Sequence, residues 1–164
     1  MIFTKLTSAA NVVFRPLATG DLDSFRAHLL RLNKQDRYSR FEGSVADTVV
    51  ADYAEYSLRT ACSTAYGAFI DGALVGVGEV FFFGELPEIA LSVDREFRRQ
   101  GIGRRLMECV LQDAGKFGFD SITFHCLADN CGVRTLAKNF GVKFQFDGSE
   151  LIGTIWTNQE LERC

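Results

Sequence analysis

This sequence has few prolines, one tryptophan and no closely spaced pair of cysteines, and these absences exclude several classes of protein. The 164 residues include two prolines and one tryptophan, and no stretch has the composition of a linker or a low-complexity tract. The five cysteines are odd in number and include no C-x-x-C pair, which argues against a disulfide framework and a zinc knuckle. No apolar run approaches the roughly 18 residues that a membrane span needs, and no secretory signal is evident. We therefore expect a cytoplasmic protein with reduced thiols and no membrane contact.

The composition is typical of one folded globular domain. Hydrophobic residues make up 47% of the chain and charged residues 24%, which excludes a disordered protein. A length of 164 residues suits a single domain, residues 1–164, with its core at about 12–156. The net charge of −3 argues against nucleic acid as a partner.

The stretch around residues 89–106 is the most informative part of the sequence. An apolar run at 89–93 predicts a strand, a charged segment with Gly101 and Gly103 predicts a loop, and apolar periodicity at about 102–117 predicts a helix. A glycine loop at a helix N-terminus presents backbone N–H groups to an anion. Five arginines add positive charge around the loop: Arg95, Arg98, Arg99, Arg104 and Arg105. We therefore predict a pyrophosphate site here.

Two common nucleotide loops do not fit this stretch. The dinucleotide fingerprint G-x-G-x-x-G lacks its third glycine, and no G-x-x-x-x-G-K-[ST] run exists. The spacing Arg98-x-x-Gly101-x-Gly103 instead resembles the acetyl-CoA signature Q/R-x-x-G-x-G/A of the GCN5-related N-acetyltransferase (GNAT) superfamily. The preceding residues 93–97 are similar to that family's V-x-P-x-Y/F lead-in, with Arg95 in place of the usual proline.

The remaining pattern resembles the same family over about residues 12–156. We predict strands at 11–15, 65–70, 74–83, 88–93, 121–127, 142–147 and 151–156, and helices at about 22–33, 45–58, 102–117 and 131–139. The resemblance implies an α/β fold (α+β by some schemes) with a mixed, mostly antiparallel sheet of six to seven strands and about four helices. It also implies that the strands at 88–93 and 121–127 are parallel and splay apart after Val93. Ser44-x-x-Asp47 resembles a capping box that opens the second helix.

Residues between the first two predicted helices are polar and aromatic. The segment 36–41 is expected as a loop that could touch a ligand. Residues 14–17 and 37–41 also resemble the acetyltransferase domains of bacterial protein-lysine acetyltransferases.

The resemblance implies how acetyl-CoA would be held. Backbone N–H groups of the loop would bind the pyrophosphate, and the pantetheine arm would pair with the strand that ends at Val93. A backbone N–H near Leu91 would polarise the thioester carbonyl. Asn130 corresponds to an asparagine that contacts the pantetheine arm in the family, and it is equally suited to cap the following helix. The implied cofactor-binding residues are Leu91, Ser92, Val93, Arg98, Arg99, Gln100, Gly101, Ile102, Gly103, Arg104 and Asn130.

The sequence offers several candidates for the groups that transfer protons. Glu88 and His125 are the leading candidates for a general base, Glu79 is a weaker one, and a water chain without a single base is an alternative. Ala137 stands where many family members carry a tyrosine that protonates the departing thiolate. The thiolate then leaves unaided, which its pKa near 8.5 permits, or another group such as Cys131 or Tyr38 donates the proton.

Together these features predict an acetyl-CoA-dependent N-acetyltransferase that acts by direct attack in a ternary complex. The acceptor would be a primary amine: a protein lysine, an N-terminus or a small-molecule amine. A homodimer is possible. The main alternative is an acyl-CoA-binding regulatory domain without turnover, which the alanine at position 137 keeps open. A nucleotide-binding domain is disfavoured by the missing fingerprint residues.

Overall fold

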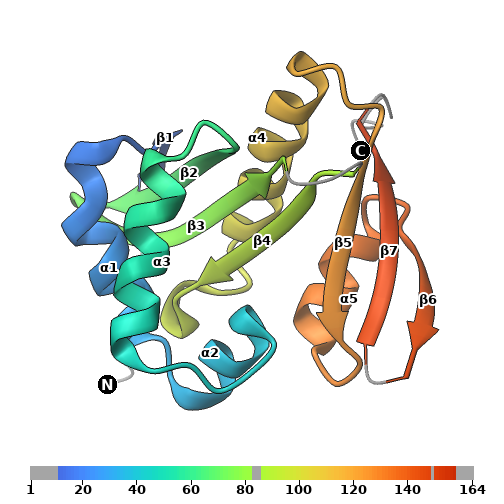
Figure 1. Ribbon diagram of the computed structural model, residues 1–164, viewed down its shortest axis with the longest axis horizontal. Helices are drawn as coiled ribbons and strands as arrows, with labels where there is room; N and C mark the ends of the chain where they lie inside the picture. The colour runs from blue at the N-terminus through green and yellow to red at the C-terminus, as the bar shows by residue number, and fades with distance from the viewer. Residues whose placement is uncertain (1–10, 83–85, 149, 158–164) are drawn as a thin grey trace, which may run out of the picture.

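The computed structural model describes residues 11–82, 86–148 and 150–157 (Figure 1). Expectations that fall on Phe83, Gly84, Glu85, Ser149 and Cys164 lie outside the described residues. Seven strands form one sheet in the order β1-β2-β3-β4-β5-β7-β6. Their bounds are β1 Val13–Pro16, β2 Ser63–Ile70, β3 Ala73–Phe81, β4 Glu88–Val93, β5 Ser121–Leu127, β6 Lys143–Asp147 and β7 Glu150–Trp156.

The sheet is mixed, as the sequence predicted. Strands β1 to β4 pair antiparallel in chain order, β4 pairs parallel with β5, and β7 pairs antiparallel with both β5 and β6. The predicted Asp71-Gly72 hairpin joins β2 to β3, and both residues have positive φ, 49° and 81°. That backbone geometry matches the right-handed twist of the two strands it connects.

Five α-helices cover the sheet: α1 Leu22–Arg31, α2 Lys34–Phe41, α3 Asp47–Arg59, α4 Ile102–Lys116 and α5 Cys131–Lys138. Helices α1 and α3 lie in front of the sheet in Figure 1, and α4 and α5 lie behind it. Apolar side chains of α1 and α3, such as Phe25 and Val50, form one core with β2 and β3. Those of α4, such as Met107 and Val110, form a second core with β3, β4, β5 and β7, and Ile102 and Leu106 of α4 belong to a third, with β2 and β3. None of the helices in the described part of the chain is long and apolar enough to cross a membrane.

Two local expectations about the N-terminal helices are wrong. Residues 36–41, expected as a loop, belong to helix α2, which begins after Asn33 because the Asn33 side chain accepts a hydrogen bond from the Asp36 N–H at 2.9 Å. The predicted Ser44-x-x-Asp47 capping box does not form. Helix α3 begins at Asp47, Ala46 is its N-cap residue, and no side chain caps it.

The parallel pairing between β4 and β5 is very short. Only Glu88 with Thr123 and Ile89 with Phe124 are paired. The two strands therefore separate after Ile89, earlier than the expected position after Val93. The second half of β4, which includes Leu91 and Val93, has an open edge toward β5. The candidate functional site described below lies at this opening.

Candidate functional site

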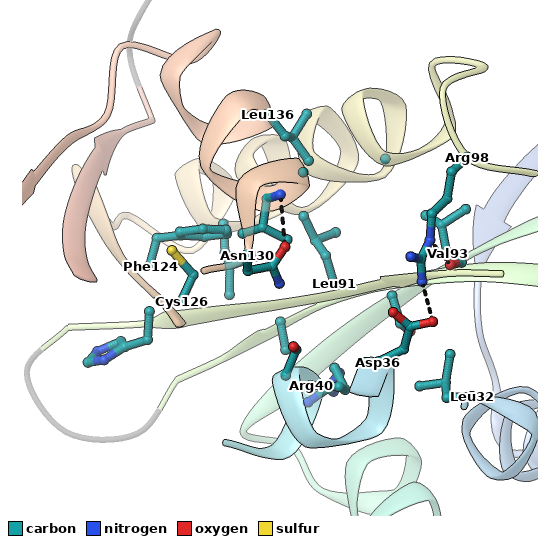
Figure 2. Close-up of a pocket in the computed structure, with 18 of the residues that line it drawn as sticks. Leu32, Asp36, Arg40, Leu91, Val93, Arg98, Phe124, Cys126, Asn130 and Leu136 are labelled. Atoms are coloured by element: carbon teal, nitrogen blue, oxygen red, sulfur yellow. Dashed lines mark hydrogen bonds and ion pairs between the residues drawn. The ribbon is translucent and has the colours of Figure 1, made fainter. Parts of the chain in front are cut away.

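A cavity of about 780 Å³ lies where β4 and β5 separate (Figure 2). Helix α2 bounds it on one side, and the start of α4 and helix α5 bound it on another. The lining comes from segments far apart in the sequence, as Asp36 on α2, Leu91 on β4, Phe124 on β5 and Leu136 on α5 show. Because β4 and β5 are unpaired here, backbone as well as side chains can face a ligand.

Alternate backbone groups of β4 point into this opening. The Pro87 carbonyl accepts from Thr123 N on β5 at 2.8 Å, whereas Asp94 N donates to Val75 O on β3 at 2.8 Å. Since backbone polar groups alternate along a strand, those of Leu91 and Val93 share the direction of Pro87 and face the opening. This is the arrangement that the sequence resemblance implied for these two residues.

The loop between β4 and α4 ends in an exposed helix N-terminus. Gly101 is the N-cap residue of α4, and both it and Arg99 have left-handed backbone conformations, with φ of 81° and 62°. The first helical hydrogen bond runs from Arg105 N to Gly101 O at 3.0 Å. The N–H groups of the first helical turn therefore have no partner within the helix and are available to an anion.

The Arg98 side chain turns away from the loop. Its Nε donates to the Val93 carbonyl at 2.9 Å, and its guanidinium lies 2.9 Å from Asp36 Oδ2 (Figure 2). Arg95 approaches the same carboxylate at 3.6 Å. The arginine side chain thus connects β4, the loop and helix α2. The Arg98 backbone N–H is also engaged, because it donates to Arg95 O at 3.4 Å, and the Gln100 side chain donates to Glu96 O at 3.3 Å.

Asn130 caps helix α5, which is one of the two roles expected for it, and its contact with a pantetheine arm stays a prediction. It lines the cavity, and its side chain accepts from Val133 N at 3.2 Å, which caps helix α5 (Figure 2). Ala137, at the position of the family's tyrosine, is fully buried in the core behind the sheet. Among the residues that the structure describes, neither Cys131 nor Tyr38 lines the cavity. Cys126, which the sequence did not single out, does line it, and burial raises the pKa of its thiol.

Two of the three candidate bases lie in the cavity. Glu88 and His125 both line it. Their neighbours Ile89 and Phe124 pack into the core behind the sheet. Because strand side chains alternate between faces, Glu88 and His125 point to the front face, the side of α2.

Glu79 is not a base in the cavity, contrary to the third expectation. It is 1% exposed and forms an ion pair with the Arg40 guanidinium. Ser57 donates to its carboxylate at 2.6 Å and Tyr53 at 3.1 Å. Burial alone would lower the pKa of Arg40, but Tyr53 and Glu79 outweigh this and raise it. Glu79 therefore anchors α2 and α3 to β3 beneath the cavity, a role that its position in mid-strand did not reveal.

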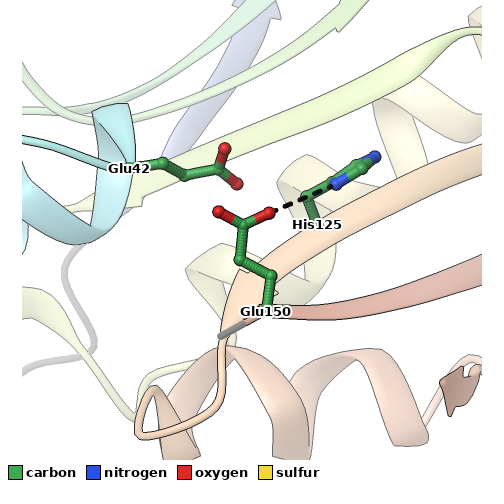
Figure 3. Close-up of side chains that lie close together, drawn as sticks. All are labelled: Glu42, His125 and Glu150. Atoms are coloured by element: carbon green, nitrogen blue, oxygen red, sulfur yellow. Dashed lines mark ion pairs between the residues drawn. The ribbon is translucent and has the colours of Figure 1, made fainter. Parts of the chain in front are cut away.

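A second charged cluster lies at the edge of the cavity. Side-chain ligand atoms of Glu42, His125 and Glu150 lie within 4.8 Å of one another (Figure 3). Glu42 has a left-handed backbone at the end of α2, and Glu150 begins β7. Burial, followed by the charge of Glu150, raises the pKa of Glu42. Such a set of carboxylates and an imidazole is suited to a cationic group, either an ammonium or a divalent metal.

The geometry defines a class of protein. A strand pair that separates beside an anion-binding helix N-terminus suits an extended ligand with a phosphate at one end, which is the shape of an acyl-CoA. The family model described as the acetyltransferase (GNAT) family matches residues 28–142. The chain belongs to this acetyltransferase family.

Several solved structures have the same fold, and the names of two of them give different acceptors. The GNAT domain of S. lividans PAT has a TM-score of 0.78 at 14% identity and covers 87% of this chain and 89% of its own. The ribosomal-protein-S18-alanine N-acetyltransferase from Escherichia coli has a TM-score of 0.70 at 16% identity, covering 93% and 98%. Spermidine N-acetyltransferase from Vibrio cholerae, solved with CoA and spermine, has a TM-score of 0.70 at 15% identity, covering 90% and 96%. At these identities the likeness shows the fold.

Proposed function

We propose that this protein transfers an acetyl group from acetyl-CoA to a primary amine by direct attack in a ternary complex. The observation that carries the proposal is the continuity of the β4–β5 opening with the N-terminus of α4. One ligand can then place a pyrophosphate on the helix and an extended arm along β4. A relative with this fold was solved with CoA.

The chain's own groups would hold the thioester as follows. Backbone N–H groups at 99–104 bind the pyrophosphate, whereas the Arg98 N–H, expected from the sequence to take part, already donates to Arg95 O. The open edge of β4 pairs with the pantetheine amides. The Leu91 N–H faces the opening and donates to the thioester carbonyl, which stabilises the negative charge that develops on its oxygen during attack. The Val93 carbonyl is already engaged by Arg98, so at this residue the arm pairs with the N–H.

The acceptor would enter from the front face, beside α2. A primary ammonium has a pKa near 10 and must lose a proton before its nitrogen can attack. Glu88 and His125 lie in the cavity on this side and are the groups that we propose for this step. The negative charges of Glu42, Glu88 and Glu150 favour a cationic acceptor, such as a lysine side chain, an N-terminus or a polyamine.

The departing thiolate needs no protonated tyrosine. The amine nitrogen bonds to the carbonyl carbon, and the C–S bond breaks. The nitrogen then gives its extra proton to solvent or to the departing thiolate, whose pKa is near 8.5. The homodimer and the cytoplasmic location remain predictions of the sequence.

Thermal unfolding with acetyl-CoA tests the cofactor. At about 100 times the Kd, a ligand stabilises the native state by about 2.7 kcal/mol, which corresponds to several degrees for this size. NAD and ATP serve as controls and should give no shift. Release of CoA in the presence of a panel of primary amines then separates an enzyme from an acyl-CoA-binding regulatory domain, which would show the thermal shift without turnover.

A further inference from the structure

A serine, a histidine and an aspartate form a chain of contacts between β4 and α1. His28 Nε2 lies 2.8 Å from Ser92 Oγ, and His28 Nδ1 lies 3.0 Å from Asp94 Oδ1. Ser92 and Asp94 are two residues apart at the end of β4, and His28 reaches them from the middle of α1. None of these side chains takes part in the mechanism proposed above.

The order of the contacts fixes how the protons are arranged. His28 is fully buried; its Nε2 is hydrogen-bonded to Ser92, and its Nδ1 lies at ion-pair distance from Asp94 without a hydrogen bond. A carboxylate next to Nδ1 favours a proton on that nitrogen, which leaves Nε2 to accept from the Ser92 hydroxyl. The Nδ1 contact is bent from the ideal hydrogen-bond line, as catalytic contacts without substrate often are.

The aspartate is itself held in place. Arg31 donates to Asp94 Oδ2 from Nε at 2.9 Å and from its terminal nitrogen at 2.7 Å. Burial alone raises the pKa of Asp94, but its hydrogen bonds with His28 and Arg31 outweigh burial and lower it. Asp94 is therefore ionised at neutral pH and stabilises a positive charge on His28.

Ser92 lies where an acyl group would be presented. It lines the cavity, is only partly buried, and follows Leu91, whose N–H faces the opening. Neighbouring Leu91 packs against the core behind the sheet, so Ser92 points to the front face with His28. The Leu91 N–H can donate to a carbonyl oxygen, and the next residue, Ser92, supplies an activated hydroxyl. Acyl transfer requires both of these groups.

We propose that Ser92, His28 and Asp94 hydrolyse acyl-CoA in this cavity when no amine is bound. His28 Nε2 takes the hydroxyl proton as Ser92 Oγ bonds to the thioester carbonyl carbon. The C–S bond breaks, and the CoA thiolate receives the proton from His28. Water then attacks the acyl-serine with His28 as base, and the carboxylic acid leaves with Ser92 restored. The net reaction converts a thioester and water to an acid and a thiol.

A fluorophosphonate probe tests the serine without CoA. Such a probe reacts with activated serine hydroxyls, so we expect labelling of the folded protein at Ser92, located by peptide mass spectrometry. Labelling should disappear after heat unfolding and in Ser92→Ala. Ser39→Ala removes another serine of the same cavity and should retain the label. Absence of label, or label at another serine, overturns the proposal.

Release of CoA from acetyl-CoA in the absence of amine tests the hydrolysis. Ser92→Ala and Asp94→Asn should each lower the rate by more than about tenfold, because the first removes the nucleophile and the second reverses the tautomer of His28. An unchanged rate in Ser92→Ala overturns the proposal even if the probe labels. This inference rests on the proposed acyl-CoA site, so the thermal shift with acetyl-CoA is measured on every variant. If the wild type shows no thermal shift with acetyl-CoA, the proposed function is refuted. Labelling by the fluorophosphonate probe reports on Ser92 alone.

Discussion

Asp36 Oδ2 lies 2.9 Å from the guanidinium of Arg98, and this contact joins helix α2 to the loop before α4. The same guanidinium donates to the Val93 carbonyl. The Asp36 side chain is 16% exposed and that of Arg98 is 38% exposed, so water screens the pair only in part. The contact links the side of the cavity proposed for the acceptor with the side proposed for the cofactor.

Removal of this link should weaken acetyl-CoA binding. For Asp36→Asn we expect a loss of about 0.2–1 kcal/mol, or up to about fivefold in Kd, because Arg98 is less firmly held against β4. Titration calorimetry measures the change. Asp47→Asn breaks a comparable ion pair with Arg37, away from the cavity, and should leave the Kd unchanged. Equal Kd values for Asp36→Asn and the wild type would refute the link.

The two loop glycines should respond differently to substitution. At Gly101 the φ of 81° is unfavourable for a side chain, so Gly101→Ala should destabilise the fold by about 1–2 kcal/mol. At Gly103 an added Cβ would lie 3.5 Å from Leu136 Cδ2, an ordinary contact, so Gly103→Ala should fold normally. Chemical denaturation measures both changes.

A large side chain at Gly103 should prevent cofactor binding. Gly103→Trp fills the space in front of the α4 N-terminus, so the thermal shift with acetyl-CoA should vanish, while Gly103→Ala should retain it. Gly101→Trp should also lose the shift. Unchanged acetyl-CoA affinity in both tryptophan variants would rule out the assignment of the loop.

The ion pair beneath the cavity should be costly to break. Glu79→Gln leaves the Arg40 charge buried without a counter-charge, which typically destabilises a protein by about 3–5 kcal/mol. The melting temperature should then fall by roughly 10 °C. Glu55→Gln is the matched control, because Glu55 pairs with Arg26 at the surface and its loss should cost less than about 1 kcal/mol. A similar small effect for both variants would contradict the anchoring role of Glu79.

Replacement of the candidate bases should distinguish between them. If Glu88 or His125 takes the proton from the amine, its glutamine variant should lower kcat by about 10²-fold or more. The acidic limb of the pH–rate profile should flatten in that variant, and acetyl-CoA affinity should be unchanged. An unaltered pH–rate profile in both variants would favour the water chain that the sequence left open.

Glu42 should make stability dependent on pH. Its folded pKa is raised above the ordinary 4.5, so folding disfavours the charged form, and the resulting destabilisation is full above the folded pKa. Glu42→Gln should therefore raise the melting temperature at pH 7. The difference from the wild type should shrink as the pH falls through the folded pKa toward 4.5 and vanish below it. A variant less stable than the wild type at pH 7 would show that the carboxylate is instead stabilised by its neighbours.

The parts of the site that sequence reasoning found are local ones. The loop with Gly101 and Gly103, the strand before it and the helix after it are contiguous in the chain, so their spacing carries the information. Helix α2 was missed because it contributes no fully buried apolar residue and has no apolar periodicity, although Asn33 three residues before Asp36 is the signal of its start.

The features of the site that sequence reasoning could not find depend on contacts between residues far apart in the chain. Glu79 meets Arg40 across 39 residues, and His28 meets Ser92 across 64. Glu42, His125 and Glu150 come from three different elements. In each case the sequence shows the residue, but its contact partner depends on how the helices pack on the sheet. The spacing of residues in one sequence does not reveal that packing.

The pairing between β4 and β5 is so short that it divides the sheet into two parts. Four strands lie on one side of the junction and three on the other, and two residue pairs of hydrogen-bonded ladder join them. Apolar side chains of α4 that pack on β3, β4, β5 and β7 form one core across the junction and hold the two parts together. The two parts of the sheet are therefore joined by side chains rather than by a full ladder, and the Leu91 backbone faces the cavity instead of a partner strand.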